Sequence, residues 1–259
     1  MPFLLSFLSL TFIRQILILV LAAPLIQWLC LELSLLFFLP LLILRRRRYT
    51  DYLIYFIIQS TGSLMFLIGT ITFPLLRFYA IVLKIGLAPF IFWLLPVISH
   101  LSWLLFFLIS TIIKLGPFCL SILYCSENSL IVITLMRYAA AIFYTMNRTR
   151  LKPIIAYRSL GSYRFLLLLG YRSLLMFISV WVLYSFRFGL LCYLLGSKAT
   201  TNWVLWIRFA NLAGLPPGLI FIVKVIMCIL FPSIFLLILL LISALLIVVY
   251  CRILVQWIV

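Results

Sequence analysis

The stretch LKIGLAPF at Leu83–Phe90 places a lysine beside a glycine and a proline within a strongly apolar sequence. The stretch GLPPG at Gly214–Gly218, followed by Lys224, brings the same residue types together in the second half of the chain. A membrane helix keeps its backbone hydrogen bonds, so clustered Gly and Pro predict an interruption that is buried in protein or lines a watery cavity. One interruption in each half is typical of a transporter built from repeats, with its ion path near the bilayer midplane.

The composition excludes a soluble globular domain. Apolar residues make up 68% of the 259 residues and charged residues only 9%, whereas a soluble domain has about 25% charged residues. The net charge of +17 comes from 20 Lys and Arg against three acidic residues. Because these cations lie between or inside apolar spans, they indicate topology signals and contacts with anionic lipids such as cardiolipin, rather than nucleic acid.

The cysteines and histidine do not form a metal or redox motif. The six cysteines are scattered without a Cys-x-x-Cys pair, and His100 is the only histidine. Haem, iron–sulfur and zinc sites need clustered thiolates or imidazoles, and no glycine-rich nucleotide fingerprint is present. We therefore expect no cofactor in this chain.

About twenty apolar residues cross a bilayer, and this length predicts ten transmembrane helices in an all-α polytopic membrane protein. The expected spans are residues 3–21, 26–44, 52–73, 76–98, 100–124, 129–146, 153–170, 173–195, 203–230 and 232–257. The span over 203–230 is long for one crossing and contains GLPPG, which predicts a helix of two halves.

Charges in the loops support this count. If alternate loops lie on alternate sides, one side carries most of the basic residues. The larger set is Arg45, Arg46, Arg47, Arg48, Arg148, Arg150, Lys152 and Lys198, and the smaller is Arg77 and Arg172. Since Lys and Arg accumulate on the side of synthesis, both termini are expected on that side.

Four titratable groups inside the predicted spans are candidates for moving protons: Glu32, Lys84, Lys114 and Lys224. Burial disfavours the charged form of a lysine, so such a group can release and retake a proton. A lone carboxylate is unfavourable in lipid, so Glu32 is expected to be protonated or paired with a cation such as Lys84. Two other interpretations stay open, namely lysines that extend to the headgroups and a purely structural ion pair.

The same residues lie in stretches that resemble subunit 2 of respiratory complex I, the proton-pumping NADH:ubiquinone oxidoreductase. Lys84–Trp93 resembles the family signature LKLGLAPFHFW, and Leu212–Lys224 resembles LGGLPPxxGFxxKW. Further matches follow the family's order: Trp28–Glu32 (W-x-G-L-E), Tyr55–Ser60 (YFLIQS), Lys114–Pro117 (QKLAP) and Leu151–Tyr157 (LRKILAYSS). The resemblance covers residues 28–225.

The resemblance implies an antiporter-like membrane-arm subunit with two inverted repeats, each with a broken helix. The first half would be residues 1–125, broken near Gly86–Pro89, and the second 126–259, broken near Gly214–Gly218. By position, the family's proton-relaying glutamate is Glu32, and its lysines are Lys84, Lys114 and Lys224.

The resemblance also implies a location and partners. It predicts a multi-pass protein of the mitochondrial inner membrane, with both termini on the matrix side and other membrane-arm subunits as partners. The chain would belong to an enzyme without doing redox chemistry itself, since NADH, flavin, iron–sulfur clusters and ubiquinone are expected on other subunits. It is similar to the shortened mitochondrial form, without the three N-terminal helices of the fourteen-helix bacterial form.

The chain departs from the family at several polar positions. Ile91 stands where the family has a histidine, Leu95–Val97 lacks its acid, and Ser162 replaces a further histidine. Two other functions therefore stay open. One is a stand-alone cation/proton antiporter, which a carboxylate-rich site would favour. The other is a structural membrane-arm subunit that no longer pumps, which the missing histidines favour.

Overall fold

A computed structural model describes residues 9–11, 13–15, 17–18, 20, 23–44, 49–87, 90–125, 152–153, 155–156, 170 and 173–197. The chain divides into two compact units, Met1–Ile133 and Thr134–Val259, and each is described by itself. Every regular element in the described residues is helical, which confirms the all-α class. The assignment of the two halves as inverted repeats stays a prediction.

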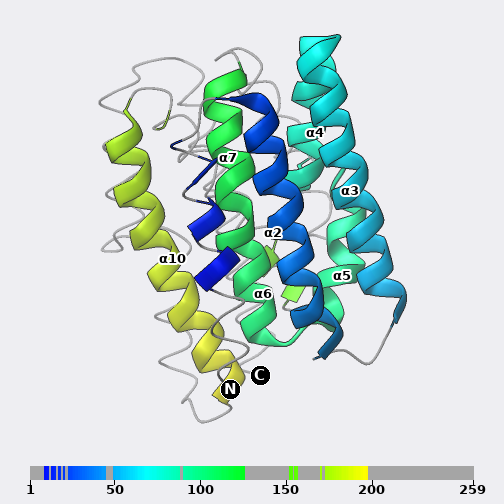
Figure 1. Cartoon of the computed structure of the whole chain (residues 1–259). Helices are drawn as coiled ribbons and strands as arrows, with labels where there is room; N and C mark the ends of the chain where they lie inside the picture. The colour runs from blue at the N-terminus through cyan, green and yellow to red at the C-terminus, as the bar shows by residue number, and fades with distance from the viewer. Residues whose placement is uncertain are drawn as a thin grey trace, which may run out of the picture. The chain divides into compact units, whose positions relative to one another are not determined.

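The first unit contains most of the described helices (Figure 1). They are α2 (Pro24–Leu44), α3 (Tyr49–Ile71), α4 (Pro74–Ile85), the 3-10 helix η1 (Phe90–Trp93), α5 (Leu94–His100), α6 (Trp103–Ser110) and α7 (Ile112–Tyr124). The second unit contains α10 (Leu174–Ser197).

Five helical segments among the described residues are long and apolar enough to cross a membrane: Pro24–Ile43, Thr50–Ile71, Pro74–Trp93, Trp103–Tyr124 and Leu174–Gly196. Each coincides with an expected span, which confirms a polytopic helical membrane protein. The other expected spans, 3–21, 129–146, 153–170, 203–230 and 232–257, fall wholly or partly outside the described residues. The number ten therefore stays a prediction.

Helices α3 and α4 form the centre of the described packing. Helix α3 packs against α2 and α4, while α4 also packs against α7 (Figure 1). Pro74 begins α4 at a position where its missing N–H removes no helical bond. The turn between α3 and α4 is tight, because a Cβ on Gly69 would lie 2.5 Å from the backbone N of Arg77.

The first predicted interruption is present at Gly86. This residue has φ 72° and ψ 45°, a left-handed conformation that ends many helices and that glycine adopts without steric strain. Its N–H donates to the carbonyls of Val82 and Leu83, and the N–H of Leu87 donates to Val82 as well. The chain continues into η1 and α5. The second predicted interruption, Gly214–Gly218, lies outside the described residues.

A bend at Thr111 was not expected from the sequence, which predicted one continuous span over 100–124. Helix α6 ends at Ser110 and α7 begins at Ile112, because Thr111 has φ −116° and ψ −75°. The hydroxyls of Ser110 and Thr111 donate to the carbonyls four residues earlier, each at 2.7 Å. Such back-bonding by Ser and Thr often bends helices, which accounts for the bend.

Candidate functional site

Lys84 is buried at the interruption of the membrane helix. It lies in the last turn of α4, and its side chain is only 5% exposed. A Cβ added to Gly62 of α3 would lie 2.9 Å from Cγ of Lys84, so this glycine leaves the space that the lysine stem fills. The carbonyls at a helix C-terminus carry partial negative charge, which stabilises an ammonium group at this position.

Side chains from neighbouring elements hold the backbone at the same break. Nε2 of Gln59 on α3 donates to the carbonyl of Lys84 at 3.1 Å. Nε1 of Trp93 on η1 donates to the carbonyl of Leu83 at 3.2 Å. The last carbonyls of a helix lack an N–H donor within the helix. The bond from Gln59 supplies one to the Lys84 carbonyl, and the bond from Trp93 adds to the one that Leu83 accepts from the N–H of Gly86. They fix the position of Lys84.

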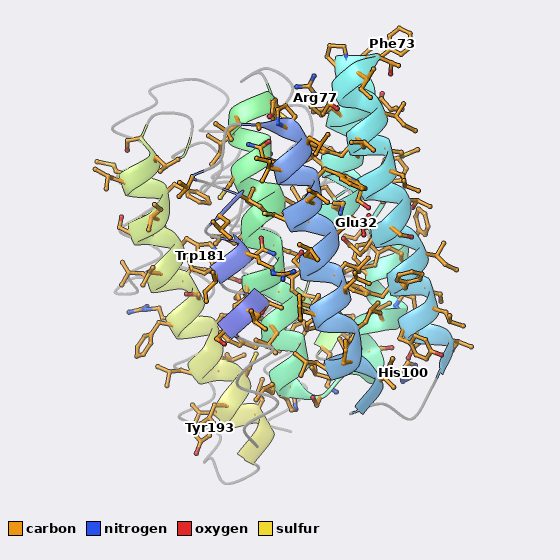
Figure 2. The ribbon with its side chains drawn as sticks, in the orientation of Figure 1. Glu32, Phe73, Arg77, His100, Trp181 and Tyr193 are labelled. Atoms are coloured by element: carbon orange, nitrogen blue, oxygen red, sulfur yellow. The ribbon has the colours of Figure 1, made fainter. Side chains whose placement is uncertain are left out.

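Glu32 lies on the side of α2 that faces α3 (Figure 2). The hydroxyl of Ser63 on α3 donates to its Oε1. The same hydroxyl lies 2.8 Å from the carbonyl of Ser60, so it has a second acceptor to which it can turn. The carboxylate of Glu32 also interacts electrostatically with Lys84. The structure thus brings Glu32 and Lys84 into one site formed by α2, α3 and α4.

Lys114 lies on a helix adjacent to that of Lys84. It is 3% exposed in the first turn of α7, just after the bend at Thr111, and α7 packs against α4. Because the chain only bends at Thr111, Lys114 does not lie at a helix end as Lys84 does. Lys224, the fourth predicted site residue, lies outside the described residues.

Sequence reasoning missed the polar residues of α3 that join Glu32 to Lys84. Gln59 and Ser63 are 5% and 0% exposed, although both lie in an apolar span. They are four residues apart, which places them on one face of the helix. Two polar residues at this spacing in an apolar span are the signal that was available. The partners of these side chains could come only from the tertiary structure.

Two residues of the expected span 3–21 were also missed. Arg14 lies over the ring of Phe37, with Cζ 4.0 Å from the ring centroid. Gln15 is 0% exposed, and neither of its amide atoms has a hydrogen-bond partner in the described part of the chain. A Cβ on Gly116 of α7 would meet Oε1 of Gln15, which places this amide against the first half of α7.

The described cysteines are buried thiols. Cys30, Cys119, Cys125 and Cys192 are free, and none is part of a group of three His, Cys, Asp or Glu residues suited to a metal in the described ranges. At the end of α7, burial raises the pKa of the Cys125 thiol to about 12. His100 is exposed at the end of α5 (Figure 2). The chemistry that the described site offers is therefore that of its carboxylate, amines, hydroxyl and amide.

Fold and site together define a polytopic α-helical membrane protein that buries ionisable side chains beside an interrupted helix. No family model matches the chain. It is 30% identical over 212 residues to NADH-ubiquinone oxidoreductase chain 2 of Artemia franciscana, covering 76% of this chain and 70% of that protein. The chain therefore belongs to the NADH-ubiquinone oxidoreductase chain 2 family.

Other relatives carry the same name. The proteins of Locusta migratoria and Gallus gallus are 30% and 26% identical, and the matches cover 44% and 57% of their lengths. A chain in the structure of respiratory complex I from Thermus thermophilus with bound aureothin has the same fold, with a TM-score of 0.74 and 19% identity. That match covers 89% of this chain but only 64% of the Thermus chain.

Proposed function

We propose that this chain is a proton-translocating membrane-arm subunit of NADH:ubiquinone oxidoreductase in the mitochondrial inner membrane. The relay residues are Glu32, Lys84, Lys114 and Lys224. Family membership supports the enzyme complex, and the burial of Lys84 and Lys114 in the same helical unit as the half-buried Glu32 supports the relay. The observation that carries the proposal is the site where Glu32 faces Lys84 across α3, beside a helix that is interrupted at Gly86.

The mechanism uses the electrostatic coupling between the carboxylate and the amines. While Glu32 is ionised, it favours the ammonium form of Lys84. Electron transfer in other subunits alters the field at one end of the relay, and protonation of Glu32 or its pairing elsewhere removes this support. Lys84 then releases its proton toward Lys114, through water or a hydroxyl, and later takes up another. A buried pair responds strongly to such a change because the surroundings screen charge poorly.

The α3 side chains have distinct roles in this scheme. The Ser63 hydroxyl donates to Glu32 while the carboxylate is ionised, and it can turn to the Ser60 carbonyl when Glu32 is protonated. The Gln59 amide holds the backbone of Lys84 while the charge of its side chain changes. Both are positioning residues, since the proton moves between carboxylate and amine groups.

The rest of the enzyme supplies the redox chemistry in this proposal. NADH, flavin, iron–sulfur clusters and ubiquinone bind to other subunits, and this chain contacts membrane-arm neighbours and anionic lipids such as cardiolipin. Both termini face the matrix, which follows from the basic loops. The relay takes protons from the matrix and releases them on the other side.

The test compares two substitutions of Lys84 in the assembled complex. Lys84→Met removes the amine, whereas Lys84→Arg keeps a positive charge beside Glu32 but cannot release a proton near neutral pH. We expect both variants to lower proton-coupled turnover by about a hundredfold, the lower end of what acid–base groups contribute. Lys152→Met, which changes a half-buried lysine in the other unit, is the matched control and keeps full turnover.

The outcomes separate the alternatives. If Lys84→Arg pumps normally and Lys84→Met does not, Lys84 is a structural cation and the relay proposal is wrong. If all variants keep the proton-to-electron ratio, the chain is a subunit that no longer pumps. A free monomer or small oligomer on native gels of mitochondrial membranes would instead favour a stand-alone antiporter.

A further inference from the structure

Arg14 is a half-buried cation in the first unit, and it lies against Phe37 of α2 rather than in the relay site. Its guanidinium stacks 4.0 Å from the ring centroid of Phe37 and interacts electrostatically with Cys30. Within the described part of the chain, its Nη1 is buried without a hydrogen-bond partner. Arginine stays charged in proteins and presents five N–H donors, so a stacked ring alone leaves most of its hydrogen-bonding capacity unused.

The position of Arg14 along its helix places it far from the membrane surface. In the expected span 3–21 it lies eleven residues from one end and seven from the other, which for a helical span corresponds to about 16 and 10 Å in a hydrocarbon core about 30 Å thick. Phe37, on which the guanidinium stacks, lies seven residues before Leu44 at the other end of α2, or about 10 Å. A phospholipid phosphate lies in the headgroup layer, so lipid alone does not supply the counter-ion at this depth.

The chain does not supply a carboxylate at this depth either. Its only acids are Glu32, Asp51 and Glu127. Glu32 accepts a hydrogen bond from Ser63, and Asp51 lies in the first turn of α3, at a helix end. Glu127 follows the last residue of α7, Tyr124, by three positions. Residues 134–259 contain no acid at all, so the second unit cannot provide the partner.

An apolar stripe borders Arg14 on the exposed side of its helix. Leu10, Ile13, Leu17 and Val20 are 37%, 52%, 39% and 72% exposed. Their spacing of three and four residues places them on one helical face, and Arg14 is four residues after Leu10 and three before Leu17. Lipid would cover the apolar residues equally well. A guanidinium at the same level is unfavourable in lipid and pairs with an acid where membrane proteins tolerate it.

We propose that a transmembrane helix of a second protein packs on the stripe Leu10, Ile13, Leu17 and Val20, and that an aspartate or glutamate half-way along this helix pairs with Arg14. Planar carboxylate and guanidinium groups form two parallel hydrogen bonds, which fixes the register of the two helices. This proposal does not depend on the proton relay. Loss of Arg14 affects attachment of the neighbour, whereas loss of Lys84 affects pumping in an intact complex.

The first experiment uses the unmodified complex. A carbene-generating apolar photoreagent dissolved in the bilayer labels side chains that contact lipid. We expect positions 10, 13, 17 and 20 to be labelled severalfold less in the intact complex than in the same chain after dissociation from its neighbours. Equal labelling in both states means that the stripe faces lipid, and it overturns the proposal.

The second experiment identifies the acid. Arg14→Lys keeps the charge and places an amine at the site. A hydrophobic carbodiimide then activates the neighbouring carboxylic acid as an O-acylisourea, and the amine displaces the urea to form an amide bond. Mass spectrometry should find residue 14 joined to an Asp or Glu within a transmembrane segment of another chain. In the Arg14→Lys variant, residue 14 joined only to this chain, or left unjoined, contradicts the proposal. The unmodified chain is the control, because arginine does not form this bond.

Arg14→Met tests the consequence for assembly. We expect the cross-linked neighbour to be lost from the complex on native gels, while Arg14→Lys retains it. Retention of that neighbour by both variants would show that Arg14 is not needed for docking, and it would count against the proposal.

Discussion

The helix that carries Lys84 and the helix that carries Lys114 are interrupted in different ways. Helix α4 stops at Gly86 in a left-handed conformation, and its freed carbonyls accept bonds from Gln59 and Trp93, which belong to other elements. The helix of Lys114 only bends at Thr111, and the hydroxyls at the bend donate back within the same helix. The first interruption is built by tertiary contacts, and the second by local ones.

This difference gives the two lysines different electrostatic settings. Lys84 is the eleventh of the twelve residues of α4, where the helix dipole stabilises a positive charge. Lys114 is the third residue of α7, after a bend that creates no such helix end. In the proposed relay, the helix end and Glu32 therefore both stabilise the ammonium form of Lys84, and Lys114 lacks the first of these supports.

Replacing Gly86 by valine should have the largest effect on this comparison. A β-branched residue with φ 72° is strained, and its Cβ would lie 3.1 Å from Cζ2 of Trp93. We expect a loss of about 3 kcal/mol in stability, the upper end for a strained backbone residue. The midpoint of thermal unfolding of the purified complex is the measurement. Gly86→Asn is the control, because asparagine tolerates this conformation better; equal losses in the two variants would show that φ is not the cause.

The break at Gly86 could be predicted from the sequence, because the combination of lysine, glycine and proline in an apolar span has few structural interpretations. The five described spans could be predicted for a similar reason, since a bilayer imposes a minimum helix length. Glu32, Lys84 and Lys114 stood out because ionisable groups are rare in lipid. Each of these inferences uses a strong and local physical constraint.

The features that could not be predicted from the sequence depend on contacts between residues that lie far apart along the chain. Gln59 acts on Lys84, which lies 25 positions later, and Ser63 acts on Glu32, which lies 31 positions earlier. The spacing of Gln59 and Ser63 indicates a polar side of α3, but nothing in the sequence pattern indicates which residues that side meets. The bend at Thr111 was missed because the apolar pattern over 100–124 is continuous, and the nearest helix-breaking residues are Gly116 and Pro117. Hydroxyl groups five and six positions earlier determine it instead.

Gly116→Ala tests whether the first part of α7 has room to adjust. An added Cβ would meet Oε1 of Gln15 and would lie 2.8 Å from Cδ1 of Ile18, and both side chains are 0% exposed. We expect a loss of about 2 kcal/mol, as for other overpacked cores. Combining it with Gln15→Ala should recover part of the loss, measured as a non-additive change in the unfolding midpoint. Strict additivity would mean that Gln15 does not limit the space at Gly116.

Thr111→Val tests the local origin of the bend. Valine has the shape of threonine but cannot donate to the Phe107 carbonyl, a bond of 2.7 Å made by a side chain that is 0% exposed. We expect a loss of about 1 kcal/mol, the usual net value of one hydrogen bond. Thr61→Val on α3 is the matched control, because Thr61 makes a similar local bond at 2.9 Å at an exposed position. A larger loss at position 61 than at 111 would contradict the special role of the bend.

Of these substitutions, Gly62→Ala should cause the smallest loss of stability, and its main effect should be on pumping. Its Cβ would lie 2.9 Å from Cγ of Lys84, and a flexible side chain of this kind can shift, so the loss of stability should stay below about 1 kcal/mol. The shift moves the ammonium relative to Glu32. In the proposed relay, this displacement should lower the proton-to-electron ratio of an intact complex. Ser60→Ala, which removes a half-buried hydroxyl two positions earlier on α3, is the control for a mutation that leaves this space open. An unchanged ratio in Gly62→Ala would mean that pumping tolerates displacement of Lys84. The rigid stop at Gly86 would then serve the fold rather than the position of the amine.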